Sequence, residues 1–204
     1  MQRYALRPLH DPYLPIAVLD APRVEEEGLG FDSLARLGLI LRVNRFFNLS
    51  ATGVEDYLLM HRSLGDWVGL IGQHFDRIGV GAALTFDTSG SRGPVNHITH
   101  PSSHLLAEVR AHLTGPFQHF GAGGAKRTMS LVSPHHIYGF IFTCLLPMLS
   151  DCQGLDLHKA GPVAVFRHAR PGDLIIGTPF NVQMRHRAAM RLPSGVCGVT
   201  SAGP

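Results

Sequence analysis

The sequence contains few cysteines and few charged residues, and both scarcities limit what the protein can do. Its three cysteines, Cys144, Cys152 and Cys197, are odd in number and show no CxxC spacing, which argues against a disulfide framework and a zinc knuckle. Charged residues make up only 16% of the 204 residues, and the longest basic run is the pair Lys126-Arg127. Because nucleic-acid binding requires clustered positive charge, we expect no nucleic-acid partner. Free cysteines favour a reducing, cytoplasmic location.

Long hydrophobic runs are also missing. The longest, residues 137–149, is too short to cross a bilayer and contains Pro147, and the N-terminal MQRYALRPLHDPYLP lacks the layout of a signal peptide. We therefore expect neither a membrane span nor secretion. Hydrophobic residues nevertheless make up 45% of the chain, enough for a globular core. Apolar sheet edges would leave self-association into a homo-oligomer open.

The first part of the chain has a helical apolar rhythm after an irregular lead of about thirty residues. Helical patterns run from Asp32 to Asn48, from Thr52, and from Ser63 to Gly79. The second pattern begins with Thr-Gly-Val-Glu, which matches a capping box. Residues 1–82 are therefore predicted to form a helical N-terminal region.

From residue 84 onward, strand-like runs alternate with helical stretches. Strands are predicted near 84–87, 95–98, 128–132, 163–166 and 195–200, and helices near 102–113, 137–149 and 179–190. Thr178-Pro179 suits an N-cap followed by proline at the first helical position. The alternation predicts an α/β domain over residues 83–204, with a mixed, largely parallel sheet flanked by helices.

The stretch LTFDTSGSRGPVNH, residues 84–97, ends a predicted strand in a loop rich in glycine and hydroxyl groups. Ligands of open α/β sheets lie beyond the carboxyl ends of strands. Gly90 and Gly93 let consecutive N–H groups curve into an anion-binding nest, to which Arg92 adds a full charge. This set suits a polyphosphate, although such a loop can also be a simple turn.

Two other phosphate or nucleophile motifs fail on spacing in this loop. A GxxxxGK(S/T) loop needs lysine after its last glycine, whereas Gly93 is followed by Pro94. A GxSxG elbow would need glycine at position 89, which is Ser89. Neither a Walker-type NTPase nor a serine hydrolase is predicted.

Three segments, in order, resemble motifs of the adenylate-forming acyl and aryl ligases, the acyl-CoA synthetase superfamily. The loop is similar to their phosphate-binding signature, roughly (Y/F)TSGSTGxPKG, through Phe86, Thr88-Ser89-Gly90-Ser91 and Gly93. The segment SPHHIYGF, residues 133–140, resembles their PxxHxxG segment beside the nucleotide and acyl pocket. The terminal GVTSAGP, residues 198–204, resembles their GGAP-like strand and turn.

The resemblance implies a fold, a reaction and a set of site residues. The fold would be part of the large domain of an adenylate-forming enzyme. The reaction would join a small carboxylic acid to AMP with Mg-ATP, and then pass the acyl or aryl group to the thiol of CoA or of an acyl carrier protein's pantetheine. The ATP phosphates would be bound by Thr88, Ser89, Gly90, Ser91, Arg92 and Gly93. The acyl and nucleotide pocket would include His136, Tyr138, Gly139, Ser201, Ala202 and Gly203.

The chain departs from the family in its loop charges and in its extent. Arg92 stands where the family loop has its second threonine, and its Pro-Lys pair is replaced by Val95-Asn96 or, with one residue deleted, by Pro94-Val95. The family motifs that support magnesium, ribose and the catalytic lysine follow the stretch covered here. The resemblance therefore concerns the N-terminal portion of such a ligase, and we expect little or no adenylation from residues 1–204 alone. The alternative is a non-catalytic nucleotide-binding or scaffold protein that keeps the fold without the chemistry.

The thirteen histidines raise the question of a metal site. His97, His100 and His104 are spaced by three and four residues. The HPSSH segment lacks the glutamate of HExxH, and Pro101 interrupts any continuous helix across it. We expect no metal site there.

Overall fold

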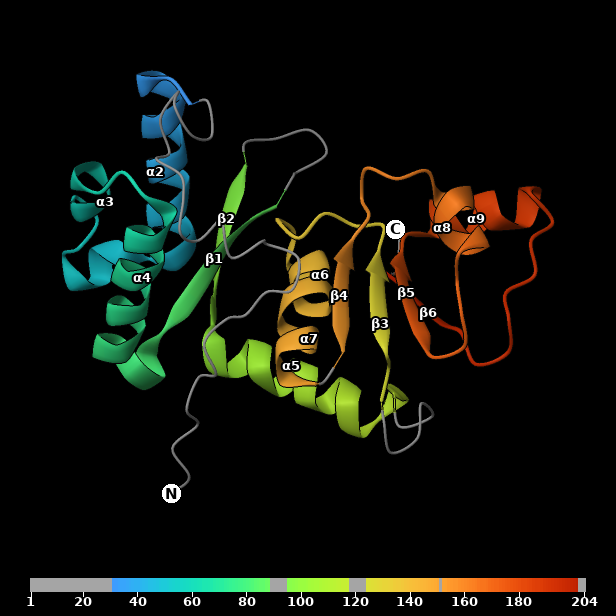
Figure 1. The fold of residues 1–204 in the computed structure, drawn as a ribbon. Helices are drawn as coiled ribbons and strands as arrows, with labels where there is room; N and C mark the ends of the chain where they lie inside the picture. The colour runs from blue at the N-terminus through green and yellow to red at the C-terminus, as the bar shows by residue number, and fades with distance from the viewer. Residues whose placement is uncertain (1–30, 89–94, 118–123, 151, 202–204) are drawn as a thin grey trace. The chain divides into compact units, whose positions relative to one another are not determined.

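The computed structural model describes residues 31–88, 95–117, 124–150 and 152–201. The chain divides into two compact units, Met1–Thr85 and Phe86–Pro204 (Figure 1). The boundary falls inside strand β1, Ala83–Thr88. Among the described residues, no helix combines the length and the apolar character needed to cross a bilayer.

The first unit is helical. Its elements are α2 (Ser33–Phe47), η1 (Leu49–Thr52), α3 (Tyr57–Met60), α4 (Leu64–Ile78) and η2 (Gly79–Gly81). The carboxylate of Asp32 accepts a hydrogen bond from Ala35 N at 2.7 Å and caps α2, and Asn48 ends that helix in the left-handed region with φ 54°. Ser63 caps α4 in the same way as Asp32. Both long helices thus begin and end where the sequence indicates.

The helix predicted to start at Thr52 does not form there, so that prediction is wrong. Gly53 takes φ 69° and ends the short 3-10 turn. The hydroxyl of Thr52 donates to the carbonyl of Leu49 at 3.2 Å, so it does not cap a following helix. The next helix, α3, begins at Tyr57. Gly53, in the left-handed conformation directly after Thr52, prevents the helix that the capping-box spacing predicts.

The core of the first unit joins α2 and α4 with the segment between them. Its buried members are Ile40, Leu49, Val54, Leu58, Trp67 and Leu70. Trp67 also donates its indole N–H to the carbonyl of His61 at 3.0 Å, so the polar atom of this buried ring is satisfied. Burial of such side chains, at roughly 1.5–3 kcal/mol each, is what stabilises a short helical unit.

The second unit contains a four-stranded parallel sheet, and the predicted α/β class is therefore present. The strand order is β4 (Gln153–Asp156), β3 (Arg127–Ser130), β5 (Asp173–Gly177), β6 (Cys197–Thr200), and every pair is parallel. A separate two-stranded sheet joins β1 to β2 (Asn96–Pro101). The mixed character expected of the main sheet is not seen in the described residues, where all four strands run the same way.

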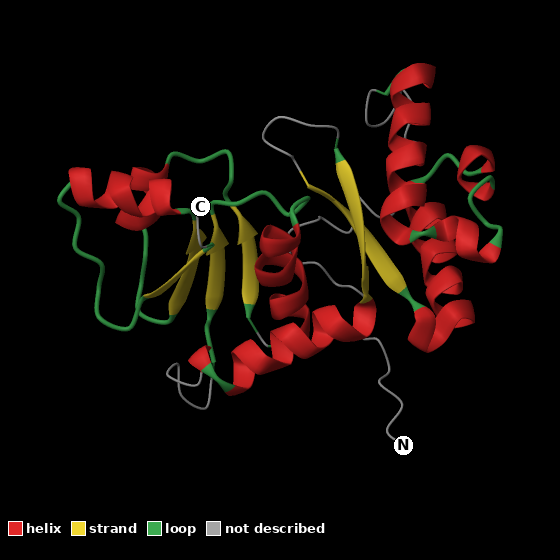
Figure 2. Cartoon of the chain, turned by 180° about the vertical axis from the view of Figure 1, so that it is seen from behind, coloured by secondary structure: helices red, strands yellow, loops and turns green. Residues whose placement is uncertain are grey.

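Helices cover both faces of the parallel sheet. One layer holds α5 (Ser102–Thr114) and a continuous helical segment made of α6 (Ile137–Phe140), η4 (Ile141–Leu145) and α7 (Leu146–Leu149). The other holds α8 (Pro162–Arg167) and α9 (Pro179–Arg187), as Figure 2 shows from behind. Right-handed crossovers in this strand order require that division. Met129, Leu131 and Ile175 accordingly pack with Val165, Phe166 and Ala169.

Two strands and one helix in this unit differ from the sequence prediction. The predicted strand at 163–166 is helix α8, which starts after Gly161 with proline in its first turn. Its run VAVF is apolar throughout, and such a short run fits a buried helix as well as a strand. Strands β4 and β5 were not predicted. β5 is buried along its whole length, so it shows no alternation, and β4 contains a single large apolar residue, Leu155.

The helical segment 137–149 widens into a π turn at Ile141–Leu145. Pro147 has no N–H to donate to the carbonyl of Thr143, four residues earlier, and this missing bond accounts for the irregular turn. That carbonyl packs against β4 at Gly154, where an added Cβ would lie only 2.6 Å from the Thr143 oxygen. Glycine at 154 therefore lets the helix lie directly on the strand.

An ion pair between the buried Asp173 and the half-buried Arg127 joins β3 and β5 at their amino ends. Arg127 donates to both carboxylate oxygens of Asp173, at 2.8 Å from Nε and 2.5 Å from Nη2. The backbone N–H of Arg170 donates to the same carboxylate at 2.7 Å. Asp173 is buried, and these three donors compensate its charge.

Candidate functional site

The order of the strands singles out one place on the sheet where a ligand is expected. The chain leaves β3 toward its neighbour β4 in one direction across the sheet, whereas it leaves β5 toward its neighbour β6 in the opposite direction. The connections that leave β3 and β5 therefore diverge, which makes the carboxyl ends of these two strands a topological switch point. Open α/β sheets bind ligands outside such a point. We call the turn after β3 with the start of α6 (residues 131–139), together with the end of β5 and the residue after it (residues 177–178), the switch-point edge.

The turn after β3 is held by its own backbone and hydroxyl groups. Ser130 Oγ donates to the carbonyl of Val132 at 2.7 Å and accepts from its N–H at 3.2 Å. Farther along, His136 N donates to the carbonyl of Ser133 at 3.3 Å. An added Cβ at Gly139 would overlap that same Ser133 carbonyl. The turn and the first turn of α6 therefore pack backbone against backbone, and only glycine fits at position 139.

Two adjacent histidines lie in this turn. Ser133 Oγ is 2.5 Å from His135 Nδ1, and the ring centroids of His135 and His136 are 3.9 Å apart. Burial lowers the pKa of His136, and repulsion from His135 lowers it further. His136 therefore presents a neutral imidazole at neutral pH, able to donate from one ring nitrogen and accept at the other.

Tyr138 reaches from α6 to the ends of two other strands. Its hydroxyl lies 2.9 Å from the carbonyl oxygen of Val199 on β6 and 3.2 Å from that of Gly177 on β5. The pKa of the phenol is raised, chiefly because burial disfavours the phenolate; hydrogen bonds with the backbone of Gly177 and Ser201 oppose this only in part. The hydroxyl is thus a protonated donor engaged with the backbone.

Helix α9 begins at the same edge. Thr178 Oγ1 accepts from Asn181 N at 3.4 Å, and Asn181 Oδ1 accepts from Thr178 N at 2.8 Å, which completes a capping box. The Asn181 side chain lies 3.3 Å from where a Cβ would stand on Gly177. The predicted N-cap at Thr178 is confirmed, whereas its reciprocal partner Asn181 was not predicted, because the usual partner is Glu or Gln.

Several of the residues assigned from sequence meet at the switch-point edge. His136, Tyr138 and Gly139 lie in one turn of chain, and the backbone of Ser201 reaches the Tyr138 phenol. Ala202 and Gly203 lie outside the described residues. Sequence reasoning missed the Ser133 to His135 contact, although both residues lie within the PxxHxxG-like segment.

Of the predicted phosphate loop, only its first residue is described. Thr88 ends β1, and its hydroxyl donates to the carbonyl of Asn96 on β2 at 3.3 Å. Ser89, Gly90, Ser91, Arg92 and Gly93 lie outside the described residues. On the flanking strands, Asp87 Oδ1 and His97 Nδ1 are 2.6 Å apart. This ion-pair geometry joins the two strands close to where the loop leaves them.

The histidines weighed as metal ligands have other neighbours. His97 contacts Asp87, and the ring of His100 lies 6.0 Å from that of Phe86. Within the described ranges, no group of three or more His, Cys, Asp or Glu side chains is placed to hold a metal ion. The three cysteines are free thiols, and burial raises the pKa of Cys152.

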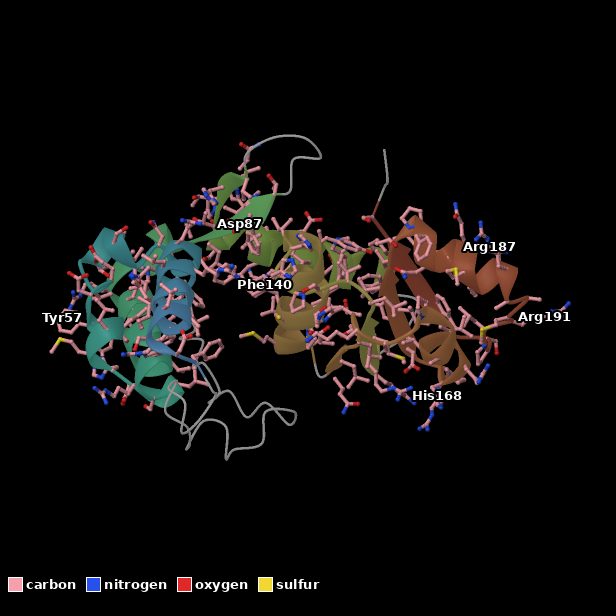
Figure 3. All side chains as sticks on the ribbon, turned by 90° about the horizontal axis from the view of Figure 1, so that it is seen from above. Tyr57, Asp87, Phe140, His168, Arg187 and Arg191 are labelled. Carbon is pink, nitrogen blue, oxygen red and sulfur yellow. The ribbon has the colours of Figure 1, made fainter. Side chains whose placement is uncertain are left out.

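Two other surface features are formed by other residues. The first unit contains a hollow of about 560 Å³ whose lining includes Gly69 and the charged residues Asp66 and Arg77. In the second unit, Arg187 and Arg191 project outward from α9 and the segment after it (Figure 3). Neither feature includes a residue of the three sequence motifs, so the candidate site is the switch-point edge.

Comparison with known proteins identifies the relatives of the chain. It is 41% identical over 181 residues to the 4-coumarate–CoA ligase of Cereibacter sphaeroides, a match that covers 89% of this chain and 44% of that protein. It is 44% identical over 186 residues to the 4-coumarate–CoA ligase of Rhodobacter capsulatus, covering 90% of this chain and 48% of that protein. The chain is related to the AMP-forming ligases. The resemblance seen in the three motifs is thereby confirmed.

A third AMP-forming ligase extends the comparison to a more distant sequence. The 4-coumarate–CoA ligase of Halorhodospira halophila is 36% identical over 179 residues, covering 88% of this chain and 43% of that protein. The chain spans about half the length of the curated relatives it matches, and it fits the N-terminal part of an AMP-forming ligase. No family model and no solved structure matches the chain.

Proposed function

We propose that the chain is part of an ATP-dependent carboxylate ligase that activates a small aromatic carboxylic acid as its adenylate and transfers the acyl group to CoA. The observation that supports this most directly is 36–44% identity to three proteins whose names state 4-coumarate and CoA. The position of the PHHIYGF segment at a topological switch point supports the same proposal on physical grounds. An acyl carrier protein in place of CoA stays an open expectation.

In the proposed first step, a carboxylate oxygen attacks the α-phosphorus of ATP, and pyrophosphate leaves. In the second step, a thiol attacks the acyl carbon, and AMP leaves. A protein accelerates such steps mainly by holding the reactants in line and by stabilising charge on the phosphates. Thr88 and the loop through Gly93 are proposed to hold the β- and γ-phosphates of ATP.

His136, Tyr138 and Ser201 are proposed to border the nucleotide and acyl group, together with Gly139, Ala202 and Gly203. A neutral His136 suits this position, because it can bond to a polar ligand atom without adding a charge that the acyl group would have to desolvate. Magnesium would arrive with ATP. The described residues offer no cluster of acidic side chains for it, so we assign none of them to the ion.

The activity proposed belongs to the whole ligase. For residues 1–204 alone we expect nucleotide binding without robust adenylation, because the match covers 43–48% of the length of the relatives. The chain is therefore expected to bind ATP in the presence of magnesium, and to exchange labelled pyrophosphate into ATP weakly or not at all when 4-coumarate is supplied.

The test compares thermal unfolding of the 204-residue chain with and without Mg-ATP. A ligand that binds only the folded state stabilises it by about 2.7 kcal/mol at 100 times its Kd. His136→Ala is expected to reduce the stabilisation given by a non-hydrolysable 4-coumaroyl adenylate analogue. His168→Ala, at the end of α8, serves as the matched control. Equal stabilisation of both variants would remove His136 from the site.

The alternative, a nucleotide-binding or scaffold protein without chemistry, is favoured by one residue. Arg92 occupies a loop position where the family has threonine, and a bulky side chain at a tight anion-binding nest can block the phosphate sterically. Arg92→Thr separates the two proposals. Tighter Mg-ATP binding by the variant would indicate that Arg92 impairs phosphate binding and would favour the non-catalytic alternative. Weaker binding would show that the guanidinium contributes to phosphate binding.

A further inference from the structure

The hydroxyl of Tyr138 connects parts of the chain that are far apart in sequence. Its two carbonyl neighbours, those of Gly177 and Val199, lie 39 and 61 residues away. Gly177 ends β5, and Val199 is the residue before the last in β6. One side chain on α6 thus contacts the carboxyl ends of β5, which pairs directly with β3, and of β6, which does not.

The ring of Tyr138 is fixed independently of its hydroxyl. It packs edge-on against Phe142, with ring centroids 5.3 Å apart. The next residue, Gly139, lies on the carbonyl of Ser133, so the turn after β3 moves together with the start of α6. His136 is the N-cap of this helix, and its carbonyl accepts from Phe140 N at 2.8 Å.

We propose that Tyr138 is a positioning residue, whose hydroxyl ties the turn bearing His135 and His136 to the ends of β5 and β6 and so sets the spacing across the switch-point edge. The role in ligand binding rests on the proposed function; the tie itself does not. Because the hydroxyl donates its one proton to these carbonyls, it has no O–H left for a ligand, and the residue offers an aromatic ring and a hydrogen-bond acceptor.

A merely structural tyrosine would behave differently. If the hydroxyl only satisfied buried carbonyls, its loss would lower the stability of the second unit as a whole. If it positions the turn, its loss loosens residues 133–140 and the end of β6 first, because the sheet ladder and the ring packing remain. The distinguishing measurement must therefore be local.

The experiment compares Tyr138→Phe with Tyr57→Phe in the 204-residue chain. Tyr57 lies on α3 with half of its surface exposed, so its variant controls for the loss of a phenol hydroxyl. For Tyr138→Phe we expect amide hydrogen exchange in residues 133–140 and 197–201 to quicken about fivefold, the factor that one net hydrogen bond represents. Exchange in α4 and α5 should be unchanged.

The second readout is the NMR signal of the His136 ring. In Tyr138→Phe its ring proton shifts should move, and its pKa should rise toward the ordinary histidine value as the turn admits water. Tyr57→Phe should change neither. Unchanged exchange and an unchanged His136 ring in a folded Tyr138→Phe would overturn the proposal, as would a uniform increase in exchange across the unit.

If Tyr138→Phe does not fold, the wild-type phenol supplies the answer. The chain has four tyrosines, so ¹³Cζ-tyrosine labelling of a chain with Tyr4, Tyr13 and Tyr57 replaced by Phe leaves one resonance. Burial at this edge raises the pKa of the phenol above the ordinary tyrosine range, and an ordinary titration would refute the burial of the hydroxyl on which the tie depends. These readouts need no ligand. Failure of Mg-ATP to bind would overturn the proposed function and leave the tie standing.

Discussion

His74 makes the first unit sensitive to acid. The side chain lies on α4 with only 1% of its surface exposed, and its Nδ1 is 2.7 Å from Thr52 Oγ1. That hydroxyl donates to the Leu49 carbonyl, so it can accept the ring N–H. Burial lowers the pKa of His74, and a hydrogen bond with the backbone of Phe47 opposes the shift in part. The folded unit thus keeps this imidazole neutral where an unfolded chain would already protonate it.

The sign and size of the effect follow from proton linkage. The unfolded chain takes up a proton on His74 near pH 6.5, the ordinary histidine value, whereas the folded chain does so only at lower pH. The free energy of unfolding is therefore highest above pH 6.5 and falls as the pH drops below it, until the folded pKa is reached. A single proton can remove up to about 1.4 kcal/mol between pH 7.5 and 5.5.

The chain contains its own probe for this measurement. Trp67 is the single tryptophan, and it is buried in the core of the same unit. Urea unfolding followed by its fluorescence, repeated from pH 7.5 to 5.5, gives the free energy of this unit at each pH. His74→Gln should remove most of the slope below pH 6.5. His61→Gln, whose side chain is 42% exposed, is the matched control and should keep it. An equal slope in wild type and His74→Gln would refute the reasoning.

Two predictions concern the sheet. Gly154→Ala places a methyl group 2.6 Å from the Thr143 carbonyl and should cost about 1–3 kcal/mol in chemical unfolding followed by circular dichroism, whereas Gly161→Ala, with open space around it, should cost far less; equal losses would contradict the close packing. Asp173→Asn removes the carboxylate charge that Arg127 and the Arg170 N–H contact and should cost about 1–3 kcal/mol in the same assay, because Arg127 is partly exposed to water; a loss under 0.5 kcal/mol, about the lower limit for one net hydrogen bond, would show that the pair contributes little.

Much of the helical first unit could be predicted because its signals are local. Asp32 and Ser63 cap helices with their own side chains, and Asn48 and Gly79 end them with positive φ. Such signals act over four residues and need no tertiary partner. The capping-box prediction at Thr52 failed because Gly53 takes the left-handed conformation, and the Thr52 hydroxyl contacts the Leu49 carbonyl and the His74 ring instead of capping a helix. The division at residue 82 into two domains stays a prediction.

The strands of the parallel sheet were harder to predict, for a physical reason. A strand buried on both faces loses the alternation of polar and apolar residues, and β5, DLIIG, has only its flanking glycine as a signal. β4 pairs with β3, and α8 packs against residues of β3 and β5, so the conformations of both segments depend on tertiary contacts. No local pattern in QGLD or PVAVFR specifies those contacts.

The sequence indicates which segment contains the candidate site residues, but not how those residues are arranged in space. The sequence places His136, Tyr138 and Gly139 in one segment, but gives no reason why Tyr138 should meet residues near 177 and 199. The strand order supplies that reason, because it sets β5 and β6 beside β3 with their carboxyl ends at one edge. The overlap of a side chain at 139 with Ser133 is likewise visible only in three dimensions.

The strand order also affects how the chain folds during synthesis. β3 and β5 lie side by side, yet the paired residues Arg127 and Asp173 are 46 positions apart, with β4 and two crossovers between them. At a translation rate of about 5–20 residues per second, β5 follows β3 by roughly 2 to 9 s. Throughout that interval β3 can pair with β4 on one side while its other edge stays open. A nascent chain is then exposed to pairing with a neighbouring copy, and slower synthesis between these two strands would lengthen the period of risk.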